Sequence, residues 1–187
     1  AEVKISNIVF MGIGEPFDNY LNVTKFIKII NHPKGLAIGS RHITVSTCGI
    51  VPKILEFADF PYQVNLAVSL HAPNDEIRNK IMPINKKYKI KEIMDALKIY
   101  YKKTKRRIIN DSEENALELS RLLKKMNCYV NLIPYNETNN LEYKRSKNDR
   151  ILKFYDIIKK NSVEVTIRRE FGGSISAACG QLRSKRE

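Results

Sequence analysis

The chain has 187 residues, of which 43% are hydrophobic and 28% charged, a composition typical of a soluble globular domain with its own core. No stretch approaches the length of a membrane span, and the N-terminal residues do not resemble a signal peptide, so we expect no membrane partner. The net charge of +13 favours a polyanionic partner such as nucleic acid, with a generic basic surface as the alternative.

The number and spacing of the cysteines indicate the redox environment of the protein. The three cysteines, Cys48, Cys128 and Cys179, are few and widely separated, which argues against a disulfide scaffold and favours a reducing, cytoplasmic environment. No pair of them has the spacing of a metal site, so we expect no metal ligands in this chain.

Hydrophobic periodicity predicts an alternation of strands and helices. Strands are expected at Ile5–Ile13, His42–Thr47, Val64–Leu70, Cys128–Ile133 and Val163–Arg168. Helices are expected at Asn22–Ile30, Val51–Ala58, Asp75–Met82, Ile90–Tyr101, Ser112–Met126 and Arg150–Lys159. This order predicts an α/β fold with parallel strands and helices outside, and the Lys-rich stretches Lys86–Lys91 and Lys102–Arg107 are interpreted as solvated faces.

One connection breaks the alternation. Only residues 105–111 join the helix that ends near Thr104 to the helix expected from Ser112, and Arg107–Ile109 is too short for a buried strand. Either two helices pack directly here, or a strand is missing. We predict a spatial jump near Ile108–Ile109, because neighbouring Cα atoms lie about 3.8 Å apart only across an intact trans peptide. An ordinary peptide bond there would exclude omitted residues but not an inherited deletion.

The exits of the predicted strands carry small and polar residues. The first strand ends in a glycine-rich turn with Gly12, Gly14 and Glu15, where the backbone can approach a ligand and a carboxylate can bind an ammonium group. A tight turn with a solvated Glu15 is the alternative. The other exits are Ser46–Gly49, Ser69–Pro73 and Pro134–Asn136, and in a barrel-like α/β sheet all of them line one mouth.

Six ordered motifs give this chain a close resemblance to a known family. They are FMGIGEP at residues 10–16, ITVSTCGIVP at 43–52, VSLHAPND at 68–75, KIMPIN at 80–85, NLIPYN at 131–136 and AACGQL at 177–182. Their order resembles that of the radical SAM RNA adenine methyltransferases of the RlmN/Cfr type, almost from end to end.

The resemblance implies an incomplete (β/α)6 partial barrel with about five parallel strands over residues 1–169, followed by a C-terminal segment, residues 170–187. It implies S-adenosylmethionine and a [4Fe–4S] cluster as cofactors. Gly14 and Glu15 would hold the methionine amino group, while Ser46, Ser69, Leu70, His71 and Asn136 would line the nucleoside site. A buried structural role is the alternative for His71. The cluster loop with its three cysteines, the strand before it and the N-terminal RNA-binding domain are absent from this chain.

By the same resemblance, Cys179 is the catalytic residue. It would take a methyl group from S-adenosylmethionine and carry it to C2 of an adenine in 23S rRNA, and in tRNA. A second family cysteine, absent here, would then release the product through a disulfide bond. The neighbours of Cys179 are alanine and glycine, so little side-chain bulk shields its thiol. The alternative is a buried core residue, which is the more common role of a free cysteine. Cys48 and Cys128 are interpreted as structural.

Partners and alternatives follow from the same family. A reductant protein such as flavodoxin would supply electrons, and we expect a monomer. Methylation at C8, as in the Cfr type, and a catalytically incompetent fragment that binds S-adenosylmethionine or RNA are the competing interpretations. A Rossmann-type methyltransferase is disfavoured, because its second strand would end in an acidic residue and here that end is Ser46–Gly49.

We predict that this polypeptide alone binds no iron–sulfur cluster and does not turn over, because the family's cluster cysteines lie outside it. The measurement is iron and sulfide quantitation after anaerobic reconstitution. A stoichiometric cluster on this chain would refute the prediction.

Overall fold

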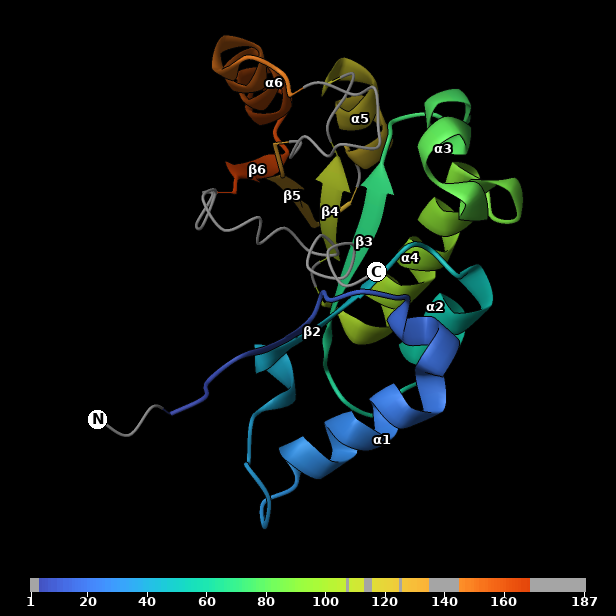
Figure 1. The fold of residues 1–187 in the computed structure, drawn as a ribbon, viewed down its shortest axis with the longest axis vertical. Helices are drawn as coiled ribbons and strands as arrows, with labels where there is room; N and C mark the ends of the chain where they lie inside the picture. The colour runs from blue at the N-terminus through green and yellow to red at the C-terminus, as the bar shows by residue number, and fades with distance from the viewer. Residues whose placement is uncertain (1–3, 107, 113–115, 125, 135–144, 169–187) are drawn as a thin grey trace, which may run out of the picture.

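The fold is one parallel sheet with helices between successive strands. The computed structural model describes residues 4–106, 108–112, 116–124, 126–134 and 145–168. In these ranges the sheet has six strands in the order β1-β2-β3-β4-β5-β6, and every neighbouring pair is parallel (Figure 1). The predicted α/β class is therefore confirmed, and the open sheet agrees with an incomplete barrel. No helix in the same ranges is long and apolar enough to cross a membrane.

The strands and helices have the following bounds. The strands are β1 (Ile8–Phe10), β2 (Ile43–Thr47), β3 (Asn65–His71), β4 (Ile108–Ser112), β5 (Cys128–Leu132) and β6 (Glu164–Ile167). The α-helices are α1 (Tyr20–Asn31), α2 (Val51–Ala58), α3 (Asp75–Ile81), α4 (Ile90–Thr104), α5 (Ala116–Leu123) and α6 (Asn148–Lys160). Short 3-10 helices are η1 (Pro16–Asn19), η2 (Ser40–His42) and η3 (Pro83–Lys86).

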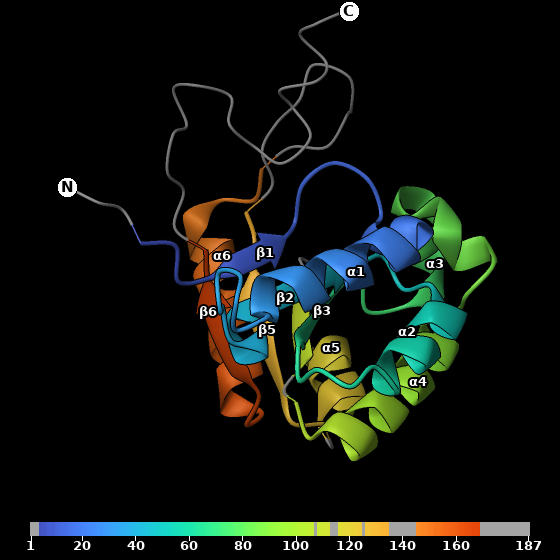
Figure 2. The same ribbon diagram turned by 90° about the horizontal axis from the view of Figure 1, so that it is seen from below.

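The two faces of the sheet differ in polarity. On β2, Ile43 and Val45 have no exposed surface, whereas Thr44 and Ser46, which alternate with them along the strand, are half-buried. The helices lie around one side of the strands (Figure 2), and the buried apolar residues belong to the core that these helices share with the sheet. The polar residues on the other face lie where the interior of a barrel would be, because successive side chains of a strand point to opposite faces.

An aromatic cluster fixes the turn that follows β1. The Phe57 ring on α2 lies 5.3 Å from the Phe17 ring on η1 and stacks at 6.1 Å on the Tyr100 ring of α4, measured between centroids. Phe17 is only 2% exposed. Large buried rings contribute strongly to core packing, so η1 is held against two helices. The site residue Glu15 lies two positions before Phe17 and is anchored by the same packing.

One sequence prediction was wrong, because β4 is present. Its residues Ile108 and Ile109 pair with Leu66 and Ala67 of β3, and the strand continues through Ser112, so no break in the chain separates Ile108 from Ile109. Asn and Asp are disfavoured in strands, yet pairing on both sides overrides that preference here. The next helix consequently begins at Ala116 instead of Ser112, while the bounds of every other predicted element lie within three residues of the observed ones.

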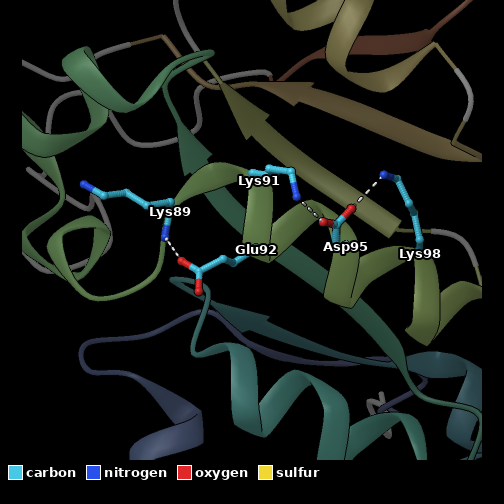
Figure 3. Close-up of polar contacts among 5 residues, drawn as sticks. All are labelled: Lys89, Lys91, Glu92, Asp95 and Lys98. Atoms are coloured by element: carbon cyan, nitrogen blue, oxygen red, sulfur yellow. Dashed lines mark hydrogen bonds and ion pairs between the residues drawn. The ribbon is translucent and has the colours of Figure 1, made fainter.

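The lysines near the start of α4 make local contacts on the helix surface. Lys91 and Lys98 both donate to Asp95, at 3.2 and 2.9 Å, and the Lys89 backbone N–H donates to Glu92 (Figure 3). Hydrogen bonds from Lys98 and then from Lys91 lower the pKa of the Asp95 carboxyl. Exposed pairs of this kind contribute little to stability, which agrees with the interpretation of this stretch as a solvated face.

Three glycines allow a matched test of the strand exits. Gly14 and Gly49 have φ values of +94° and +104°, and an added Cβ at Gly49 would lie 2.7 Å from Cδ1 of Ile93. An added Cβ at Gly12 or Gly14 meets no atom of the described residues within 4 Å beyond its chain neighbours. We expect Gly14→Ala to lower the free energy of unfolding by about 1 kcal/mol, because alanine is strained at this φ. We expect Gly49→Ala to lower it by about 2–3 kcal/mol, because the added methyl group also overpacks against Ile93.

Urea unfolding of the variants is the measurement, and Gly12→Ala is the control because it carries neither penalty. Equal losses for Gly12→Ala and Gly49→Ala would contradict the structural explanation.

Candidate functional site

The site residues predicted from the sequence gather at the carboxyl ends of the first three strands. Gly14 and Glu15 follow β1, Ser46 lies near the end of β2, and Ser69–His71 closes β3. Because these strands are parallel neighbours, their carboxyl ends lie at the same edge of the sheet, where α/β folds bind ligands. Asn136 and Cys179, and the whole segment 170–187, lie outside the described residues.

Glu15 links the exits of β1 and β2 through its carboxylate. Oε1 accepts a hydrogen bond from the Phe17 N–H at 3.0 Å, and Oε2 accepts one from the Cys48 N–H at 2.6 Å. A carboxylate has about four acceptor positions, so these two bonds leave room for a ligand ammonium group. The sequence predicted only the ligand role of Glu15, whereas the structure adds a role in joining two strand exits.

The backbone beside Glu15 is open. Gly14 has φ +94°, which favours glycine, and among the described residues, its chain neighbours aside, no atom lies within 4 Å of the position that a Cβ would take. As far as these residues are concerned, a ligand group can approach the main chain at this turn. The glycine-rich turn thus combines open space with a carboxylate whose position is fixed.

Two serine side chains meet on the polar face of the sheet. Ser46 Oγ lies 3.5 Å from Ser69 Oγ, and both residues are half-buried. The strand register continues from Ser69 across the sheet. Its successive partners on β4, β5 and β6 are Asp111, Asn131 and Thr166. The structure therefore brings Ser46 and Ser69 together beneath the exits that carry Glu15 and His71.

Leu70 and His71 contribute in different ways. The Leu70 side chain is fully buried in the core, so only its main chain can face a ligand. His71 has φ +59° and follows a bulge in the pairing of β3 with β4. Loss of solvation and then the positive charge of Arg78 lower the pKa of the His71 imidazole, although part of the residue remains exposed. The ring is accordingly neutral near pH 7, and one of its nitrogens can accept a hydrogen bond.

Arg78 is the residue of this site that the sequence did not reveal. It lies on α3, is fully buried, and donates to the carbonyl oxygens of Leu70 and Cys48 at 3.0 and 2.6 Å. In the sequence it falls between the motifs at 68–75 and 80–85. The sequence feature that could have indicated Arg78 is its place on a short helix that directly follows the end of β3.

The comparisons with known proteins agree with this geometry. The sequence pattern of the Radical SAM superfamily matches residues 1–126. The chain belongs to the radical SAM superfamily.

Among relatives of this radical SAM chain, one from Acholeplasma laidlawii is 57% identical over 192 residues, covering 98% of the chain and 57% of the relative. One from Thermoanaerobacter sp. is 56% identical and is covered to 56%. Both are named "Probable dual-specificity RNA methyltransferase RlmN", which confirms the resemblance to this type. The chain thus spans little more than half the length of these relatives. The first alignment is longer than the chain's 187 residues, so that relative has residues within the matched region that this chain lacks.

Solved structures support the fold. A radical SAM methyltransferase from Sphaerobacter thermophilus is 42% identical with a TM-score of 0.91, and the match covers 95% of this chain and 55% of that one. A domain of pyruvate-formate lyase-activating enzyme from Bacteroides vulgatus matches with a TM-score of 0.67 at 12% identity, covering 88% of this chain and 100% of that domain. The second likeness concerns the fold alone.

The residues of the radical SAM chain differ in how well they suit its cofactors. The open turn at Gly14, the Glu15 carboxylate and the serine pair are donors and acceptors that fit the amino acid and ribose parts of S-adenosylmethionine. In the part of the chain that the structure describes, no three His, Cys, Asp or Glu side chains gather as a metal ligand set. These residues therefore fit the nucleoside cofactor and offer no ligand set for the cluster.

Cys48 lies at this site, but its thiol is not activated. Burial, followed by a hydrogen bond with Glu15 and the charge of that carboxylate, raises the pKa of Cys48 to about 12. The thiol thus stays protonated at neutral pH, and the thiolate is the nucleophilic form. The structural interpretation of Cys48 agrees with this environment.

We predict that Cys48 in the folded protein reacts with iodoacetamide at pH 8 about thirtyfold more slowly than in the urea-unfolded chain, since little thiolate is present. Mass spectrometry of the Cys48 peptide over time gives the rate. Glu15→Gln is the matched variant, and it should speed the reaction because it removes the nearby negative charge. Equal rates in the folded and unfolded chains would contradict the assigned pKa.

Proposed function

We propose that this chain is the S-adenosylmethionine-binding barrel of a radical SAM RNA methyltransferase that methylates C2 of an adenine in 23S rRNA, and in tRNA. The observation that carries the proposal is 57% identity over 98% of the chain to a relative named as a dual-specificity RNA methyltransferase. The net charge of +13 supports it, because basic residues neutralise RNA phosphates and release their counterions. Charge alone gives affinity and not sequence choice, so the RNA targets rest on the family.

The described residues have distinct tasks in this proposal. Glu15 binds the ammonium group of S-adenosylmethionine while its two existing bonds keep the carboxylate in place. The hydroxyl groups of Ser46 and Ser69 face the nucleoside, and the neutral His71 ring offers an acceptor beside them. The [4Fe–4S] cluster, when bound, supplies the electron for reductive cleavage of S-adenosylmethionine. Its ligands belong to a segment outside this chain.

Cys179 in the segment 170–187 is assigned the chemical step that precedes RNA modification. Its thiolate attacks the methyl carbon of S-adenosylmethionine, so that an S–CH3 bond forms on Cys179, the bond from the sulfonium sulfur to that carbon breaks and S-adenosylhomocysteine leaves. A base carbon such as adenine C2 is electrophilic at best and does not attack the methyl carbon itself. The methyl group on Cys179 therefore becomes the source of the carbon transferred to RNA.

The remaining parts of the proposal concern the setting of the reaction. A protein reductant such as flavodoxin supplies the electrons, the protein acts as a monomer, and the few cysteines suit the cytoplasm. The target adenine must leave its stack to reach the strand exits, as is general for enzymes that modify bases. Binding of S-adenosylmethionine or RNA without turnover is the second candidate for the isolated chain, because it spans 57% of its relative.

The test uses the complete protein that contains this chain, with RNA digested to nucleosides and compared with 2-methyladenosine and 8-methyladenosine standards. We expect 2-methyladenosine from the unaltered protein and a loss of at least about a thousandfold in Cys179→Ala, as is typical when a nucleophile is removed. Cys128→Ala is the control and should retain activity, because Cys128 is buried at the start of β5. Retained activity in Cys179→Ala would remove the nucleophile assignment, and 8-methyladenosine as product would overturn the C2 assignment.

A further inference from the structure

Arg78 is a buried cation at the centre of the strand exits. Its Nε donates to the Leu70 carbonyl at 3.0 Å, Nη1 to Asn85 Oδ1 at 2.8 Å, and Nη2 to the Cys48 carbonyl at 2.6 Å. The residue is fully buried, and none of these hydrogen-bond partners is a carboxylate. Burying a charge without direct ionic pairing is costly unless its donors are well satisfied, so a role for this particular geometry is expected.

The bond to Leu70 controls the backbone that leads into His71. The Leu70 carbonyl belongs to the peptide unit that joins Leu70 to His71, so the guanidinium fixes the orientation of that unit. His71 has φ +59°, a left-handed conformation that costs a non-glycine residue roughly 1–2 kcal/mol. Such a conformation persists only when its surroundings enforce it, and the Arg78 bond lies immediately before it.

The bond to Cys48 connects Arg78 with Glu15. The Cys48 N–H donates to Glu15 Oε2, while the Cys48 carbonyl accepts from Arg78 Nη2, both at 2.6 Å. The main chain of Cys48 is thus held from its two sides by groups of opposite charge. A continuous series of hydrogen bonds therefore runs from Glu15 through Cys48 and Arg78 to Leu70, and it joins the exits of β1, β2 and β3.

The third bond fixes Arg78 itself. Asn85 accepts from Arg78 and donates through Nδ2 to Asp75 Oδ1 at 2.9 Å, and the same Asp75 oxygen accepts from the Ile90 N–H at 3.0 Å. These contacts tie α3, η3 and the start of α4 into one unit behind the guanidinium. Arg78 is thus oriented before any ligand binds, which reduces the ordering that binding must otherwise impose.

We propose that Arg78 is a positioning residue for S-adenosylmethionine, which sets the relative placement of the Glu15, Cys48 and Leu70–His71 backbones without touching the ligand. This inference rests on the proposed function. A lysine cannot replace the arginine, because one ammonium group lacks the planar fork that reaches Leu70, Asn85 and Cys48 together.

The test compares Arg78→Lys with Lys80→Arg in the complete protein during RNA methylation. Lys80 lies two residues away on the same helix and is exposed, and it forms an ion pair with Glu76 at 3.3 Å. For Arg78→Lys we expect KM for S-adenosylmethionine to rise about tenfold to a hundredfold, with kcat and KM for RNA within about twofold of the unaltered protein, because misplaced binding groups weaken ligand binding. Lys80→Arg should leave all three values unchanged, because it keeps the positive charge of an exposed side chain.

Two results would overturn the role of Arg78. One is an unchanged KM for S-adenosylmethionine in Arg78→Lys, and the other is a fall in kcat alone, which is what a partly unfolded enzyme gives. Absence of RNA methylation by the unaltered protein would instead overturn the proposed function, so the two failures are distinguishable.

A measurement on the unaltered chain covers the case in which Arg78→Lys does not fold. In NMR spectra, S-adenosylmethionine should shift the amide resonances of Cys48 and His71 and slow the exchange of the Arg78 Nε proton, because binding tightens the series of hydrogen bonds. Binding that leaves all three signals unaltered would overturn the proposal.

Discussion

The main chain of Cys48 lies between a carboxylate and a guanidinium, and the arrangement of the site depends on that contact. Glu15 holds the N–H of Cys48 and Arg78 holds its carbonyl, each at 2.6 Å. Charged partners make stronger hydrogen bonds than neutral ones, and these two groups join the exits of three strands. The serine pair, the open glycine turn and the left-handed His71 all lie around this link.

Two sources of stability support this arrangement from different sides. Behind β1, the Phe17 ring is packed against Phe57, which also stacks on Tyr100, so η1 and the Glu15 turn are fixed by apolar contact. Behind β3, the Asn85–Asp75 contacts hold α3 by hydrogen bonds. Neither depends on the exposed lysines, whose pairs with Asp95 lie on the outer surface of α4. The exposed lysines of α4 therefore contribute little to holding the site together.

Most site residues at the carboxyl ends of the strands could be predicted, because the hydrophobic periodicity of the sequence shows where each strand ends. Glu15, Ser46 and His71 lie at the ends of apolar or alternating runs, and parallel pairing brings such ends together whatever the details of packing. Arg78 could not be found this way, since its role arises from the tertiary position of a short helix. The strand β4 was missed because Asn110, Asp111 and Ser112 lack strand character, and pairing with β3 and β5 provides what their sequence does not.

Because β1 is an edge strand, its link to Cys48 through Glu15 affects how readily the strand separates from the sheet. This strand has three residues and, in the sheet as described, a neighbour on one side only. A short strand at the edge of a sheet is the part that opens most readily, and here it leads into the turn that carries Glu15, the carboxylate proposed to bind the ligand. Ligand binding at that turn and the pairing of β1 with β2 are then coupled, so each stabilises the other. A cofactor bound at this turn would therefore stabilise the edge strand of the described sheet.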